Sequence, residues 1–234
     1  MKKESISTYF IALLMASSLW LLPSSLHAQE KKGQTSEAQV QPFFQGIYVG
    51  ADVFGIANKA LGSDIMSTEI SLEAHLKNRF FPIVEIGYGS IETTSDETDI
   101  YYKTSAPYFR LGVDYNVFHQ KPHLPGFFTV GLRYGCSSFS YDIEAPALVD
   151  PNWGHTSVPF SYQGVKSNAS WAELVIGLKA NVFDNLYMGF SVRYRSLIST
   201  KKHENSDPYY IPGYGQGKSP SYGLTYNLIY KLPF

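Results

Sequence analysis

The sequence predicts an all-β protein: an eight-stranded antiparallel transmembrane β-barrel with short periplasmic turns and long extracellular loops. Three observations lead to this fold class. Apolar and polar residues alternate in eight separate runs, the chain begins with a basic and then apolar segment, and the last run ends on Phe234. Alternation with a period of two residues indicates a strand with one apolar face, and no run shows a sustained helical period.

The runs differ from the strands of a water-soluble sheet in the composition of their polar face. One face of each run is apolar, and the other combines glycine and serine with single charged residues. A membrane barrel has this arrangement, because its apolar face contacts lipid and its small inward-facing residues leave room for long charged ones. The predicted strands are Gly46–Ile56, Met66–Leu76, Ile83–Ile91, Tyr108–Phe118, Phe127–Tyr141, Trp171–Phe183, Leu186–Ile198 and Ser221–Phe234.

The connections between these runs alternate in length, as they do in outer-membrane barrels. The expected short turns are Lys77–Pro82 and Asp184–Asn185, and the connection His119–Gly126 is of modest length. The expected long outer loops are Ala57–Ile65, Glu92–Pro107, Asp142–Ser170 and Ser199–Pro220. A soluble lipocalin-like barrel is the alternative, and the composition of the two faces and the N-terminal segment favour the membrane.

The N-terminal segment has the features of a secretory signal peptide. Lys2 and Lys3 precede the apolar stretch Tyr9–Leu22, and Ala28 is a small residue suited to cleavage. We therefore expect a signal peptide over residues 1–28, a flexible periplasmic leader over 29–45, and an outer-membrane barrel over 46–234. The chain has one cysteine, Cys136, so no intramolecular disulfide can form.

The charged residues of the inward face predict an ion network that fills the lumen. Acidic and basic residues are nearly balanced there, and unpaired charges in a narrow lumen would be costly. The acidic members are Glu69, Glu73, Glu85, Asp114 and Glu173, and the basic members are Arg110, Arg133, Lys179, Arg193, Arg195 and Lys231. We also expect His75, two residues from Glu73, to form a hydrogen bond in the lumen.

No motif for catalysis or for cofactor or metal binding emerges. His119 and His123 lie in a turn beside Pro122 and Pro125, which disfavours a metal-binding helix, and no Ser-His-acid spacing stands out. The net charge of −1 disfavours a nucleic-acid binder. We expect a non-catalytic barrel with a structural or interaction role. An envelope-lipid modifying enzyme of the deacylase or acyltransferase type, and a small ligand-uptake pore, remain the alternatives.

Specific recognition, if the barrel has it, is expected in the two longest outer loops, because functional residues commonly lie in loops on a rigid scaffold. Their candidate recognition residues are Trp153, His155, Tyr209, Tyr210 and Tyr214. Such aromatic residues can bind an extracellular glycan or protein ligand, but they can also form a capping core or a girdle at the lipid boundary. The other expected partners are outer-membrane lipid and the barrel-assembly machinery, and we expect a monomer.

Several blocks of the sequence carry a resemblance to a known family. They are NRFFPIVEIGYG (Asn78–Gly89), YKTSAPYFRLGVDYN (Tyr102–Asn116), DPNWG (Asp150–Gly154), SVRYR (Ser191–Arg195) and YYIPGYG (Tyr209–Gly215). In this order they resemble a family of small outer-membrane β-barrel proteins of unknown function from Bacteroidetes-type bacteria. The resemblance covers nearly all of the chain after the leader. It implies the barrel fold and the envelope location, and it implies no catalytic residues.

The last run carries the expected assembly signal. Tyr230, Leu232 and Phe234 alternate toward the end of the chain. This ending resembles the terminal strand of Gram-negative outer-membrane barrels, whose assembly machinery reads an aromatic C-terminal residue preceded by alternating apolar ones.

Deletion of Phe234 is therefore expected to impair assembly. The lost burial alone would cost only a few kcal/mol, so the larger effect is the loss of a recognition signal. Outer-membrane fractionation and heat-dependent gel mobility measure the outcome. A truncated protein that reaches the outer membrane in normal amounts and keeps its heat resistance would contradict the prediction.

Overall fold

A computed structural model describes residues 42–60, 62–121, 124–149, 157–201, 203 and 206–233. The expected signal peptide, most of the leader, Trp153, His155 and Phe234 lie outside these residues. The described residues belong to one compact unit. Among them, no helix is long and apolar enough to cross a membrane.

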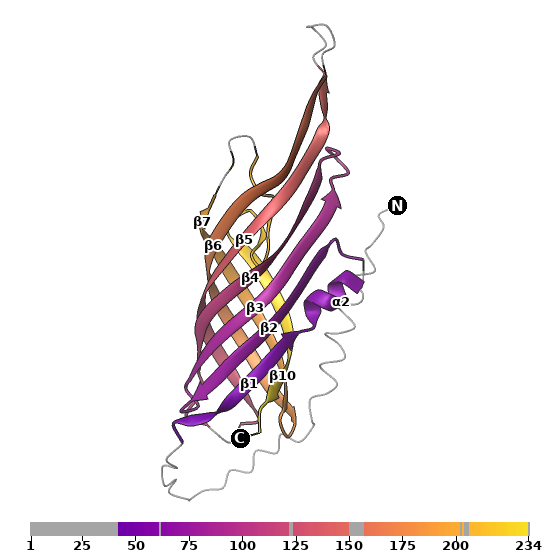
Figure 1. Cartoon of the computed structure of the whole chain (residues 1–234). Helices are drawn as coiled ribbons and strands as arrows, with labels where there is room; N and C mark the ends of the chain where they lie inside the picture. Colours follow the sequence, from indigo (N-terminus) through magenta and orange to yellow (C-terminus); the bar gives the residue numbers. More distant parts are fainter. Residues whose placement is uncertain are drawn as a thin grey trace, which may run out of the picture. The chain divides into compact units, whose positions relative to one another are not determined.

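Eight long strands form one closed, antiparallel ring (Figure 1). Their order around the ring is β1-β10-β7-β6-β5-β4-β3-β2, and β1 closes the ring by pairing with β10, for example Ala51 with Leu228. The strands are β1 (Phe44–Asp52), β2 (Ile65–Leu76), β3 (Phe80–Thr94), β4 (Tyr101–Asn116), β5 (Gly126–Val149), β6 (Ser157–Phe183), β7 (Leu186–Thr200) and β10 (Ser221–Lys231). The predicted all-β, eight-stranded antiparallel sheet is confirmed.

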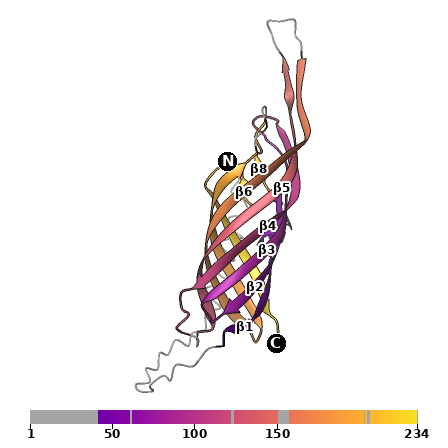
Figure 2. The same ribbon diagram turned by 60° about the vertical axis from the view of Figure 1, so that its left-hand side comes forward.

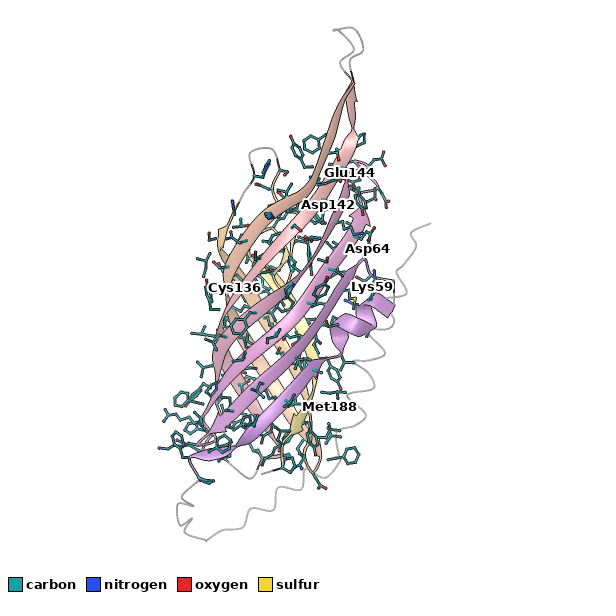
Figure 3. All side chains as sticks on the ribbon, viewed as in Figure 1. Lys59, Asp64, Cys136, Asp142, Glu144 and Met188 are labelled. Atoms are coloured by element: carbon teal, nitrogen blue, oxygen red, sulfur yellow. The ribbon has the colours of Figure 1, made fainter. Side chains whose placement is uncertain are left out.

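The two faces of the ring are inverted relative to a water-soluble protein. Large apolar side chains point outward, and Ile70 and Leu132 are 63% and 65% exposed. The alternate positions point inward and carry buried charges, such as Arg110 at 2% exposure. Apolar side chains therefore lie on the outer face of the ring and charged ones on the inner face; Figure 3 shows the side chains on both faces of the strands.

A short helix, α2 (Phe54–Ala60), replaces the end of the first predicted strand. The prediction of a strand through Ile56 is wrong because Asp52 caps the helix. Its carboxylate accepts a hydrogen bond from the backbone N–H of Phe54 at 3.0 Å. Gly55 then lies against the backbone of Ser67 in β2, where a Cβ atom would be 1.9 Å from a carbonyl oxygen.

Two of the predicted outer loops are mostly strand. The loop predicted over Glu92–Pro107 shrinks, because β3 runs to Thr94 and β4 begins at Tyr101. The loop predicted over Asp142–Ser170 is largely a hairpin of β5 and β6 that extends beyond the rest of the ring (Figures 1 and 2). Both faces of such a hairpin meet the same solvent, so its sequence lacks the alternation from which strands are predicted.

Inward-facing glycines make room for large neighbouring side chains. At Gly135 an added Cβ atom would lie 2.3 Å from the ring of Trp171, which is fully buried. Small and large residues on adjacent strands thus share one layer of the interior.

Replacing Gly135 with alanine is expected to destabilise the ring by about 1–3 kcal/mol, the usual cost of overpacking. Cys136→Ala, one position along on the outer face, is the matched control. Thermal unfolding followed by gel mobility measures both variants. Equal unfolding temperatures for the two variants would show that Trp171 does not need this space.

Candidate functional site

The middle of the ring holds a cluster of buried ion pairs, which we call the central ion cluster. Its members are Glu69, Glu85, Asp114, Glu173, Arg110, Arg133, Arg193 and Arg195. Glu85 is shared among three guanidinium groups: its oxygens lie 2.9 Å from Arg133, 2.9 Å from Arg193 and 3.3 Å from Arg110. Because these groups come from β3, β4, β5 and β7, the cluster crosses the interior and links strands that do not all pair directly.

The ion pairs continue toward the end of the ring where the turns are short. Lys179 pairs with Glu73 and lies 3.7 Å from Asp114. Glu73 is 2.5 Å from Nε2 of His75, so the expected hydrogen bond of His75 is present. The predicted member Lys231 stands apart. Its ammonium lies 5.9 Å from the ring centre of Tyr48 and forms no ion pair with a described residue.

Aromatic rings fill the interior beside His75. The imidazole stacks between Tyr48 and Phe81 at centroid distances of 3.7 and 3.6 Å. Phe127 and Tyr187 add further ring contacts. This aromatic layer occupies the short-turn end of the ring.

A segment from the predicted loop Ser199–Pro220 occupies the opposite end of the interior. We call residues 208–217 the plug. It contains β8 (Tyr210–Ile211) and β9 (Gly215–Gln216), which pair with each other. Ring residues hold its backbone: Arg110 donates to the carbonyl of Gly213 at 2.6 Å, and Arg195 donates to that of Tyr214 at 2.9 Å.

The plug changes the interpretation of three candidate recognition residues. Tyr210 and Tyr214 are buried, at 4% and 0% exposure, and Tyr214 packs against Trp171 at 5.9 Å. Burial raises the pKa of Tyr210. Only Tyr209 of the three is exposed. The burial of Tyr210 and Tyr214 fits the capping core that was the alternative to a recognition surface.

These layers leave little free volume in the described interior. A cavity of about 20 Å³ lies beside the central ion cluster, lined by Glu73, Glu85, Arg133 and Lys179 among others. That volume suits about one water molecule. The described residues thus give no support to the pore alternative.

The described histidines also give no catalytic pairing. His75 bonds Glu73, His119 lies 3.2 Å from the hydroxyl of Tyr115, and the ring of His203 packs near Tyr162. No histidine side chain in the described ranges bonds a serine hydroxyl, and no described group of acidic, histidine or cysteine residues could hold a metal ion. The enzyme alternative gains no residues from this part of the chain.

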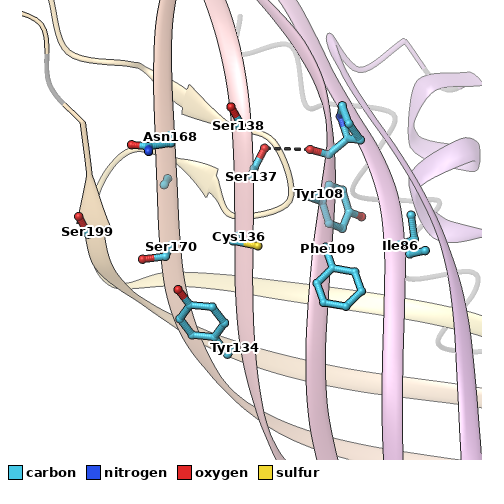
Figure 4. A pocket seen from close by; sticks show the side chains of 12 residues that line it. Ile86, Tyr108, Phe109, Tyr134, Cys136, Ser137, Ser138, Asn168, Ser170 and Ser199 are labelled. Atoms are coloured by element: carbon cyan, nitrogen blue, oxygen red, sulfur yellow. Dashed lines mark hydrogen bonds between the residues drawn. The ribbon is translucent and has the colours of Figure 1, made fainter.

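The outer face carries a pocket of about 610 Å³ where β4 and β5 separate (Figure 4). Pairing between these strands stops at Thr104 with Tyr141 and resumes at Tyr108 with Ser137. Within the gap, the carbonyl of Pro107 accepts a hydrogen bond from the Ser137 hydroxyl at 3.0 Å. In an antiparallel strand the N–H and C=O of one residue face the same neighbour, so the Pro107 nitrogen also faces β5 and has no hydrogen to donate.

The pocket lies at a change of polarity on the outer face. Its lining residues are Ile86, Pro107, Tyr108, Phe109, Tyr134, Cys136, Ser137, Ser138, Asn168, Ala169, Ser170 and Ser199. Sequence analysis missed it because Pro107 falls in the predicted loop Glu92–Pro107, whereas it lies inside β4, where a proline interrupts strand pairing.

A family model described as a domain of unknown function (DUF6048) matches residues 6–234. The chain belongs to this family. No curated protein and no solved structure matches it.

Glu85→Gln is expected to destabilise the ring by about 3–5 kcal/mol, because it leaves three buried guanidinium groups short of negative charge. Glu92→Gln is the control. Glu92 is an exposed carboxylate that accepts a hydrogen bond from Tyr101 and pairs with Lys103, and its loss is expected to change stability little. Denaturant unfolding in detergent compares the two. Equal midpoints would contradict a structural role for the cluster.

Proposed function

We propose that this protein is a plugged outer-membrane β-barrel with a structural or interaction role and no catalysis. The observation that carries the proposal is the band of apolar side chains around the outside of the closed ring. Its outward positions include Ile70, Leu72, Ile86, Leu111, Val113, Leu132, Leu174, Ile176, Leu178, Phe190, Val192, Leu224 and Leu228, all exposed. An apolar surface of this extent would promote aggregation in water, whereas in a membrane it would contact the acyl chains of lipids.

Aromatic residues border this band, as expected at the two interfaces of a membrane. Near the short turns, Arg79 lies over the rings of Phe80 and Tyr115 at 5.2 and 5.5 Å, and Lys121 lies over Phe118 at 5.7 Å. Toward the other end, Tyr194 and Tyr222 pack together at 5.5 Å. Aromatic girdles flanked by basic residues match the polarity of headgroup regions.

The unequal ends of the ring suggest its orientation. One end has tight turns, such as Lys77–Asn78, where both residues have positive φ, of 51° and 54°. The other end carries the plug and the long β5–β6 hairpin, which we assign to the outside. The hairpin, with Asp142 and Glu144 on it, is the surface that this orientation offers to an extracellular glycan or protein (Figure 3).

A single charge in the middle of the band tests the membrane location. Leu132→Arg is expected to destabilise a membrane barrel by about 2–4 kcal/mol and to lower the amount in the outer membrane. In water, the same change at a residue that is 65% exposed would be neutral or favourable for solubility. Ser140→Arg, also outward on β5 but beyond the band, is the control.

Flotation of cell membranes and heat-dependent gel mobility report the result for both variants. Normal membrane levels and stability of Leu132→Arg, or recovery of the wild-type protein in the periplasmic fraction, would overturn the proposal.

A further inference from the structure

We propose that the pocket at the Pro107 gap binds a phosphorylated glycolipid of the outer leaflet. Its acyl chain would lie on the apolar part of the pocket, its sugar hydroxyls on the polar part, and its phosphate beside two lysines. This inference rests on the proposed membrane location and adds a specific lipid site to it.

The pocket exists because the sheet is interrupted, and not because a side chain is small. Beside the gap between β4 and β5, three buried residues of the inward face, Tyr108, Ser137 and Ala169, form part of the pocket lining. Figure 4 shows Tyr108 and Ser137 there. The ring stays closed around it, since β4 keeps its pairing with β3 across the same positions, including Tyr88 with Pro107. A groove in a rigid sheet can hold one acyl chain in a defined position, which the rest of the apolar outer face cannot do.

The lining changes from apolar to polar along the strands. Ile86, Phe109 and Tyr134 are outward-facing members of the apolar band, between 41% and 59% exposed. Next along β5 and β6, the outward positions become Ser138, Ser170 and Asn168, with Ser199 paired to Ser170 from β7. Hydroxyl and amide groups match the hydroxyls of a sugar, while the apolar side chains match an acyl chain.

Two lysines stand next to this polar part. The backbone N–H of Lys201 donates to the carbonyl of Asn168 at 2.9 Å, which places Lys201 directly beside it. Lys166 is two residues from Asn168 and therefore on the same outward face of β6.

Neither lysine forms an ion pair with a described residue, whereas Lys103, on the outer face of β4, pairs with Glu92 at 3.2 Å. The carboxylate of nearby Asp142 forms no ion pair with either lysine and instead accepts a hydrogen bond from the backbone N–H of Gly164. Two exposed ammonium groups above a polar–apolar boundary provide the charge complement of a lipid phosphate.

The first test measures retention of lipid A by the full-length protein in detergent, using native mass spectrometry. The double variant Lys166→Gln/Lys201→Gln is expected to retain about tenfold less lipid A than the wild type. Ser138→Trp, which fills the pocket without changing charge, is expected to lower retention as well. Lys77→Gln/Lys121→Gln removes two charges at the other end of the ring and is expected to leave retention unchanged.

Cys136 supplies a second readout that does not depend on the lysines. It lines the pocket, is partly buried and is the one cysteine of the chain. Lipid A is expected to slow its reaction with a maleimide severalfold in the wild type, and dephosphorylated lipid A is expected to slow it less.

The outcomes separate this inference from the membrane proposal. Failure of the wild type to float with membranes would overturn the membrane location itself. Normal flotation with equal lipid A retention by all variants, and no protection of Cys136, would overturn the lipid site alone. Retention of phosphatidylglycerol as strong as that of lipid A would overturn the assignment to a glycolipid.

Discussion

The structure depends on neutralising charge inside a ring of strands. An isolated ion has a high desolvation cost in such a space, and removing one partner of a buried pair is strongly destabilising. Glu85 meets three guanidinium groups, and Glu69 contacts both Arg110 and Arg193. Each of these residues lies on a different segment of the ring. The cluster thus specifies the register of several strands at once, because a slip of one residue would turn its charges outward.

The same requirement determines where small residues occur. An added Cβ atom at Gly131 would lie 1.9 Å from the Asp114 carboxylate, and one at Gly112 would lie 2.5 Å from the Arg133 side chain. Long charged groups from one strand therefore lie over glycines of the next. Side chains of complementary shape fill the middle of the ring. The plug fills one end of the interior, and the aromatic layer fills the other.

Local pattern was sufficient to predict the eight strands of the ring but not their extensions, because alternation persists only where one face is apolar and the other is inward. It also predicted which charged residues face inward, although the partners of each depend on register and tilt. Alternation is absent from the plug, whose buried position comes from contacts with Arg195 in β7 and with Arg110, which is far away in the chain. The hairpin extension and α2 were not predicted for a related reason. Neither element has one face toward the interior and the other in the apolar outer band, so neither shows the alternation of the ring strands.

The position of the plug in the chain has a consequence for how the molecule is completed. The plug lies between β7 and β10, and β10 is also the strand that closes the ring against β1. The segment from residue 208 to the end of β10 therefore both covers the interior and closes the ring. Without this segment, Arg110 and Arg195 would lack the carbonyl groups that accept their hydrogen bonds, and β1 would have an unpaired edge. The closure of the wall and the filling of the interior therefore depend on the same segment of the chain.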